Sequence, residues 1–227
     1  MTTSNVEETI GAILGSLRTR NFCFLDEPVD WAAYQTASDR IHTHFTIPAT
    51  AITPPMRRAL FAIGNLWPAP DILGLGTYVG YAVAWLWAGG VARHGSATLT
   101  GYDIDASAVN SAGANFAAAF GSATNASFVA RDALKPGPGG GRGIVYIDID
   151  DPDDGKWGYL PTLDAHVGSM ARPGLVLAHD PVIPKFADAM AAFRQHLVDL
   201  GFEEPVILPL DNCGILLAQL PMAPDRD

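Results

Sequence analysis

The stretch DILGLGTYVGYA, Asp71 to Ala82, places an apolar segment, a glycine-rich turn and the start of an apolar helix in direct succession. The first five residues fit a buried strand, and the apolar segment that begins at Val79 is long enough for a helix. A strand that runs through a glycine turn into a helix is typical of an α/β sheet. Because glycine adopts positive φ without steric cost, the turn also lets the backbone approach a ligand closely. The stretch therefore predicts a fold class and the region of a binding site.

The same alternation of strand and helix continues to residue 200. Strands are predicted at 71–75, 97–103, 126–130, 143–149 and 174–180, and helices at 79–92, 106–119, 158–171 and 185–200. This pattern is typical of an α/β fold with a doubly wound, mostly parallel sheet. The segments 205–210 and 214–220 are too close for a crossover helix. We expect them to pair as a terminal antiparallel hairpin, which brings the sheet to seven strands.

Three further helices are predicted before the sheet, at about 4–19, 30–45 and 55–64. The segment TIPATAITPP, residues 46–55, contains three prolines and fits a stiff linker between the second and third of these helices. We therefore expect an N-terminal helical extension over residues 1–49, which would act as a lid over an acceptor pocket. A ligand-binding domain would occupy residues 50–227.

Charge and composition argue against nucleic acid and membranes as partners. The chain carries 14 Lys and Arg against 24 Asp and Glu, for a formal net charge of −10, so nucleic acid is not an expected partner. The most apolar run, residues 78–92, is too short to span a bilayer and contains glycines, so no membrane partner is expected. The two cysteines lack metal-binding spacing and the first residues do not resemble a signal peptide, which favours a cytoplasmic location.

The spacing of the glycines indicates which ligand the turn could bind. Gly74, Gly76 and Gly80 form G-x-G-x-x-x-G, one residue longer than the dinucleotide fingerprint, and the Lys-Ser/Thr pair of a phosphate loop is missing. Asp103 ends the next strand, where an ionised carboxylate suits the two hydroxyls of a ribose. A nucleoside ligand without phosphates fits both features, and S-adenosylmethionine (SAM) is such a ligand. The competing interpretation is structural: a common glycine turn and an aspartate that caps the next helix.

Carboxylates also end two later strands. Asp148 follows the apolar segment GIVYI, and Asp180 ends GLVLAHD. At neighbouring strand ends, these two side chains could share a hard divalent cation such as Mg²⁺, which would position a hydroxyl and lower its pKa. Asp150 or Asp151 could add a ligand, while the next two aspartates fit a solvated acidic turn.

His179, next to Asp180, is a candidate general base because an imidazole titrates near neutral pH. Successive side chains on a strand point to opposite faces, so we expect His179 and Asp180 to point apart. If Asp180 faces the ligand, His179 would then be a buried residue on the other side of the sheet.

Taken in order, these motifs resemble the class I SAM-dependent methyltransferases, and within them the catechol and caffeoyl-CoA O-methyltransferases. The resemblance covers about residues 50–220 and rests on GLGTYVGYA, ARDAL, VYIDIDD, ARPGLVLAHD and VILPLDNCGILLAQL. It implies a Rossmann-like methyltransferase fold with SAM as cofactor. The implied reaction is methyl transfer to a hydroxyl of a small aromatic acceptor, assisted by a divalent cation. The N-terminal helices are expected to contribute to a homodimer.

The resemblance also implies roles for individual residues. The cofactor-binding residues would be Gly74, Gly76, Tyr78, Gly80, Tyr81, Asp103, Ile104, Asp132, Ala133 and Asp148. Asp148 and Asp180 would be the metal ligands. Together with His179, they are the predicted catalytic residues.

Three positions depart from the family pattern. Gly74 stands where the family usually has an acid, Asp151 where it often has a catalytic lysine, and Pro181 where it has a third, asparagine ligand. Proline offers no side-chain ligand atom. Two alternatives therefore stay open: a metal-independent N-, C- or carboxyl-methyltransferase of a small specialised metabolite, or a SAM-binding protein that has lost turnover.

Overall fold

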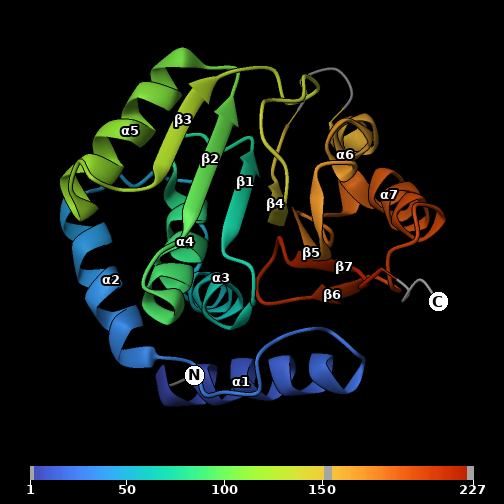
Figure 1. Ribbon diagram of the computed structural model, residues 1–227, viewed down its shortest axis with the longest axis horizontal. Coiled ribbons are helices and arrows are strands. Elements are labelled where there is room, and N and C mark those ends of the chain that lie inside the picture. The colour runs from blue at the N-terminus through green and yellow to red at the C-terminus, as the bar shows by residue number, and fades with distance from the viewer. Residues whose placement is uncertain (1–2, 151–154, 224–227) are drawn as a thin grey trace.

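The computed structural model describes residues 3–150 and 155–223, which form one sheet with helices on both faces (Figure 1). The strands are β1 (Asp71–Leu75), β2 (Thr98–Asp103), β3 (Ala126–Ala130), β4 (Arg142–Ile147), β5 (Met170–His179), β6 (Val206–Leu208) and β7 (Ile215–Leu220). The helices are α1 (Thr3–Thr19), α2 (Trp31–His44), α3 (Pro54–Leu66), α4 (Tyr81–His94), α5 (Ala106–Phe120), α6 (Tyr159–Val167) and α7 (Ala187–Asp199), with short 3₁₀ helices η1 (Lys156–Gly158) and η2 (Pro184–Phe186). Within these two ranges, no helix combines the length and the hydrophobicity that a membrane crossing requires.

The strand order of the seven-stranded sheet is β3-β2-β1-β4-β5-β7-β6. Strands β1 to β5 pair in parallel, and β7 runs antiparallel to both β5 and β6. The predicted doubly wound sheet with a terminal hairpin is therefore confirmed. Strands β1 and β4 are neighbours although β2 and β3 separate them in the sequence, so the strand order reverses between them. Open α/β sheets bind their ligands at the carboxyl ends of such strands.

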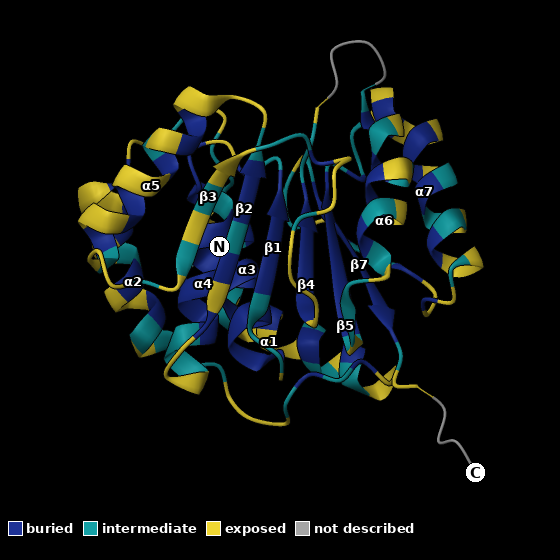
Figure 2. Cartoon of the chain, turned by 45° about the horizontal axis from the view of Figure 1, so that its top comes forward, coloured by how far each residue is buried: buried dark blue, intermediate teal, exposed yellow. Residues whose placement is uncertain are grey.

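Alternate residues of the central strands enter two separate apolar clusters. Ile72 and Ile144 belong to the cluster that includes side chains of α1 to α5, whereas Leu73 and Val145 belong to the cluster with α6 and α7. The central strands are buried on both faces, and only the edge strand β3 is largely exposed (Figure 2). A parallel sheet needs this double cover, which explains why its strands are almost continuously apolar.

The N-terminal helices share the first of these clusters with the sheet. Leu14 of α1 and Ile41 of α2 are buried in it together with Trp85 of α4. Helix α1 packs against α3, and α2 packs against α4 and α5. The three predicted helices are thus present, and the first two are anchored on the helix layer of the sheet. The functional division near residue 49 stays a prediction.

Predicted boundaries in the segment from β4 to β5 need correction. The helix predicted at 158–171 ends at Val167, because Gly168 follows as its C-cap and β5 already begins at Met170, opposite Arg142. The strand predicted at 143–149 ends at Ile147. Asp148 therefore lies in the loop at the rim of the sheet, where its side chain is free to turn toward β5.

Candidate active site

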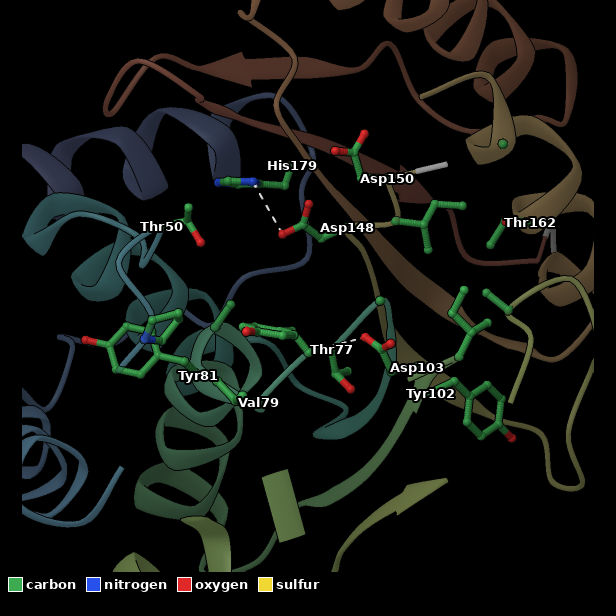
Figure 3. Close-up of a pocket in the computed structure, with 18 of the residues that line it drawn as sticks. Thr50, Thr77, Val79, Tyr81, Tyr102, Asp103, Asp148, Asp150, Thr162 and His179 are labelled. Carbon is green, nitrogen blue, oxygen red and sulfur yellow. Dashed lines mark hydrogen bonds and ion pairs between the residues drawn. The ribbon is translucent and has the colours of Figure 1, made fainter. Parts of the chain in front are cut away.

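The carboxyl ends of the parallel strands border a cavity of about 460 Å³ (Figure 3). This volume is in the usual range for a small-molecule site. Its walls come from the loops after β1, β2, β3 and β4, from the ends of β2 and β5, from the start of α6, and from residues 48–52 of the proline-rich linker. Among the described residues, the N-terminal contribution to the wall comes from this linker and not from α1 or α2.

The loop after β1 is shaped by bonds to the neighbouring strand. Gly76, Tyr78 and Gly80 have φ of 77°, 46° and 80°, so the loop alternates through the left-handed region. The amides of Gly76 and Thr77 donate to the Tyr102 carbonyl at 2.9 and 3.1 Å. A Cβ atom on Gly76 would overlap the backbone carbonyl of Asp148. The close approach that requires glycine here is therefore to the end of β4, within the protein itself.

The predicted cofactor residues divide into two groups by position. Those that line the cavity are Gly76, Tyr78, Tyr81, Asp103, Ile104, Asp132, Ala133 and Asp148. Gly74 and Gly80 are absent from its wall. Gly74 lies inside β1 between Gly101 and Tyr146 of the adjacent strands, and Gly80 is the N-cap of α4. A Cβ atom on Gly74 would overlap the Thr77 side chain, so Gly74 leaves room for the loop, and Gly80 ends it.

Asp103 keeps acceptor capacity toward the cavity. Its carboxylate accepts the Tyr78 amide at 2.7 Å and the Asp105 amide at 3.0 Å, one on each oxygen. Each carboxylate oxygen has two lone pairs, so both can still accept a hydroxyl. The cap of α5 is Asp105, whose side chain accepts the Ser107 amide at 2.8 Å. The structural alternative, in which Asp103 caps the next helix, does not hold.

Apolar side chains surround Asp103 on the cavity wall. Tyr78, Ile104 and Leu134 line the cavity with exposed fractions of 53%, 79% and 48%. Large apolar residues gathered in this way at a cavity mouth are typical of a ligand site. The Ala133 carbonyl beside them accepts a bond from Nε2 of the buried His166 at 2.8 Å. A flat apolar group next to a diol would fit this half of the cavity.

Asp148, His179 and Asp180 converge at the other half. Nδ1 of His179 lies 3.1 Å from Oδ1 of Asp180 and 3.5 Å from Oδ2 of Asp148, the contact drawn in Figure 3. The prediction that His179 and Asp180 point apart is wrong. β5 ends at His179 and Asp180 has a φ of 68°, which breaks the strand alternation and brings the two side chains together. Asp148 and His179 line the cavity, whereas Asp180 lies behind them.

Lys156, which the sequence analysis did not select, joins this group. Its ammonium lies 3.2 Å from Oδ1 of Asp148 and 2.9 Å from Oδ2 of Asp180, and it also donates to the Ile149 carbonyl at 2.9 Å. Only 1% of its side chain is exposed. Lysine is almost never buried so fully unless it is paired. Two features of the sequence could have pointed to Lys156: the chain has only three lysines, and Lys156 follows Asp148 by eight residues.

The four charged groups shift one another's pKa values. Burial alone would lower the pKa of Lys156 and His179, but the two carboxylates outweigh it: they raise the pKa of Lys156 and raise that of His179 to about 10. Burial would raise the pKa of Asp148 and Asp180, yet bonds from His179 and the charge of Lys156 lower both, that of Asp180 well below its usual range. Near neutral pH, two carboxylates therefore face two cations.

This donor set does not fit Mg²⁺ held by Asp148 and Asp180. Mg²⁺ requires near-octahedral oxygen ligands, and the Lys156 ammonium already lies between the two carboxylates. Pro181 offers no side-chain ligand atom. Of the two further predicted ligands, Asp150 lines the cavity, whereas Asp151 lies outside the described residues. His179, Asp180 and Cys213 do place one potential ligand atom each within 4.8 Å of one another. Burial and the neighbouring Asp180, however, raise the pKa of the Cys213 thiol to about 11.

Comparison with solved structures supports the fold. An O-methyltransferase from Bacillus cereus in complex with SAH is 14% identical, with a TM-score of 0.61 over 86% of this chain and 93% of that one. The O-methyltransferase TomG from Streptomyces achromogenes in complex with SAM is 17% identical, with a TM-score of 0.60 over 97% and 99%. SAH-bound methyltransferase PaMTH1 from Podospora anserina is 14% identical, with a TM-score of 0.60 over 94% and 96%.

The sequence itself matches no family profile and no curated protein. At identities of 14 to 17%, the structural likeness concerns the fold. The chain has a Rossmann-like methyltransferase fold. Evidence for a ligand and an activity therefore comes from the residues of the cavity.

Proposed function

We propose that this chain is a SAM-dependent O-methyltransferase that transfers a methyl group to a hydroxyl of a small aromatic acceptor. The observation that carries the proposal is that a single cavity joins Asp103, with its apolar surroundings, to Asp148. A nucleoside and an acceptor bound at these two ends would meet at the loop after β1. The O-methyltransferases of the same fold add support for this reaction class.

The first half of the cavity has the groups that SAM requires. Asp103 would accept the two ribose hydroxyls, and Ile104 and Leu134 would pack on the adenine faces. The buried Oγ1 of Thr77, on the cavity wall, has no hydrogen-bond partner among the described residues. A buried hydroxyl without a partner is costly, so a polar ligand atom beside Thr77 would be favoured. The acidic chain and the lack of a phosphate loop further favour a ligand without phosphates.

In the second half, Asp148 is placed to handle the acceptor. When bound, SAM would supply a methyl group attached to a sulfonium. A lone pair of the acceptor oxygen would form the new O–C bond, while the S–C bond breaks and its electron pair stays on sulfur. Ionised Asp148 would accept the hydrogen bond of the acceptor hydroxyl and hold its oxygen in line, which is mainly a proximity effect. The hydroxyl proton would pass to Asp148 and then to water.

A low pKa of Asp148 is compatible with this role. An oxygen that is gaining a methyl group becomes strongly acidic, so even a weakly basic carboxylate accepts its proton. His179, with its raised pKa, would keep its own proton near neutral pH. We therefore assign His179 to holding Asp148 in place instead of to general-base catalysis.

The proposal is tested by binding and turnover with the full chain. Calorimetry with SAM and with SAH should give saturable binding of one ligand per chain. Incubation with SAM and a panel of phenols, catechols, amines and carboxylic acids should then produce SAH only with hydroxyl acceptors. Failure to bind SAM would overturn the proposal, and SAH formation with amines or carboxylic acids alone would replace it by the metal-independent N- or carboxyl-methyltransferase. The homodimer and the cytoplasmic location stay predictions, the former open to size-exclusion chromatography with light scattering.

A further inference from the structure

The ammonium of Lys156 has every donor in use. Its three N–H groups have three acceptors, on Asp148, Asp180 and the Ile149 carbonyl, at 2.9 to 3.2 Å. The rings of Tyr159 and Phe186 lie over it at 5.1 and 5.4 Å, where aromatic faces attract a cation. Lys156 is therefore held on all sides, and it does not reach the cavity wall.

Every carboxylate oxygen of Asp148 and Asp180 already faces a cationic nitrogen of the chain. Oδ1 of Asp148 and Oδ2 of Asp180 face Lys156, while Oδ2 of Asp148 and Oδ1 of Asp180 face Nδ1 of His179. Each of the four oxygens thus has a nitrogen neighbour from the chain. A divalent cation bound between the carboxylates would have to displace the ammonium from a site with little solvent, which is costly for a buried charge.

Local backbone geometry positions Lys156 between Asp148 and Asp180. Gly155 has a φ of 57°, and η1 begins directly after it, so the chain turns sharply and directs Lys156 back toward Asp148. α6 follows at Tyr159, whose hydroxyl donates to the His179 carbonyl at 3.3 Å. The lysine, both strand ends and the start of α6 are connected to one another by these bonds.

We propose that Lys156 is the permanent counter-ion of Asp148 and Asp180 and takes the place of a divalent cation, so that methyl transfer at this cavity needs no metal. The inference rests on the proposed function for its catalytic part. Because Lys156 acts through Asp148 and touches neither cofactor nor acceptor, it is a positioning residue. It fixes the Asp148 carboxylate at the cavity wall with its charge compensated.

The first experiment measures metal binding independently of activity. The full chain, freed of metal with a chelator, is titrated with Mn²⁺ and followed by electron paramagnetic resonance. Wild type should bind no Mn²⁺ at this site, whereas Lys156→Met, which frees both carboxylates, should gain a Mn²⁺ site that Mg²⁺ competes for. The matched control is Lys185→Met, which removes an exposed lysine that lies 4.3 Å over the same Phe186 ring and should behave as wild type.

The second experiment separates positioning from binding. SAM-dependent turnover of wild type should be unchanged by EDTA and by added Mg²⁺. Lys156→Met should lower kcat by roughly 10- to 100-fold, as for other residues that orient a reacting group, and leave the dissociation constant of SAM unchanged. Lys156→Arg, which keeps the charge, should recover part of kcat and still exclude Mn²⁺. If Lys156→Met fails to fold, wild type and Lys156→Arg still test the metal prediction.

Several results would overturn the inference. These are a Mn²⁺ or Mg²⁺ site in wild type that activates turnover, activation by Zn²⁺ through the His179, Asp180 and Cys213 group, or a folded Lys156→Met variant that gains no Mn²⁺ site. The failure of the proposed function would look different. SAM would then not bind to wild type, while the Mn²⁺ titrations would still report whether Lys156 excludes a metal.

Discussion

The two halves of the cavity edge differ in whether their polar groups already have partners within the protein. The proposed cofactor half, formed by the loops after β1, β2 and β3, offers one aspartate with free lone pairs among exposed apolar side chains. The proposed catalytic half consists of Asp148, Lys156, His179 and Asp180, whose charges are paired with one another. The first half gains its partners when a ligand binds, whereas in the second half the charges are already paired within the protein, and Nε2 of His179 is left without a partner among the described residues. In the proposed reaction, ligand recognition thus depends on open hydrogen-bond acceptors, and the positioning of the reacting groups depends on paired charges.

The difference predicts opposite sensitivities to substitution. Removing one member of a compensated buried cluster leaves an unpaired charge, so the effect falls on folding. Removing an open acceptor such as Asp103, which also accepts two backbone amides, costs the folded state less, so the main effect falls on binding. Substitutions in the two halves can therefore show whether this contrast holds.

The largest expected effect is that of Lys156→Met on stability. Two partly buried carboxylates would lose the buried cation that they share, and breaking a buried pair costs about 3–5 kcal/mol. Urea unfolding of the full chain measures the change. Lys185→Met, on the exposed side of Phe186, should change the free energy of unfolding by less than about 0.5 kcal/mol. Adding Asp180→Asn to Lys156→Met should restore part of the loss, and a loss no larger than that of the control would contradict the cluster.

Gly76→Ala should disturb both halves at once, because the two halves touch at this residue. A Cβ atom there would overlap the Asp148 carbonyl, and the φ of 77° is unfavourable for alanine. A left-handed residue costs about 1–2 kcal/mol and overpacking about 1–3 kcal/mol. The expected loss in the free energy of unfolding is therefore about 2–5 kcal/mol, together with weaker SAM binding.

Gly95→Ala separates the two causes of that loss. Gly95 has a φ of 73° but no atom within 4 Å of its would-be Cβ, so the variant reports the backbone cost alone. Equal losses for Gly76→Ala and Gly95→Ala would mean that the contact between the β1 loop and Asp148 is unimportant.

These contacts also mark the limit of what the sequence could predict. The strands were predictable because burial on both faces forces apolar runs such as GIVYI, and the parallel order followed from the helices between them. Asp103 and Asp148 were predictable because they end such runs. The helix predicted at 158–171 was too long because the pairing of Met170 with Arg142 depends on a distant strand.

The composition of the catalytic half was less accessible. The meeting of His179 with Asp180 depends on the positive φ of Asp180, which strand alternation does not anticipate. The role of Lys156 depends on the turn at Gly155 and on two strand ends that are far apart in the sequence. Residue types at strand ends predict which acids meet. Which basic residue lies between these acids depends on long-range packing.

Asp103→Asn tests the open half, and its effect should be on binding. The amide keeps one acceptor oxygen but loses the charge and the second acceptor. A hydrogen bond to a charged group contributes about 1.5–3 kcal/mol, so the SAM dissociation constant should rise roughly ten- to hundredfold. Calorimetry measures the change, with Asp105→Asn as the matched control, since asparagine still caps α5. Unchanged SAM affinity in Asp103→Asn would remove the main support for the nucleoside site.

The smallest expected effect concerns pH and His166, the buried residue that holds the cofactor half to α6. Burial lowers the pKa of His166 in the folded chain, and Arg142 and Arg131 lower it further. The unfolded chain, with a histidine pKa of about 6.5, then binds more protons, so the contribution of His166 to stability is present above about pH 6.5 and is lost as the pH falls below it.

Urea midpoints measured between about pH 7.5 and pH 5 check this prediction, because they cover the window in which an unfolded histidine titrates. His179, whose pKa is raised in the folded chain, acts in the opposite direction in this window, so the test is the difference between wild type and His166→Gln. His166→Gln, whose side-chain amide can still donate to the Ala133 carbonyl, should gain less than about 1 kcal/mol on wild type as the pH falls. The same pH dependence in His166→Gln as in wild type would show that the link between α6 and the cofactor half does not depend on a neutral imidazole. The acid sensitivity of the fold would then have to be sought in the carboxylates of the other half.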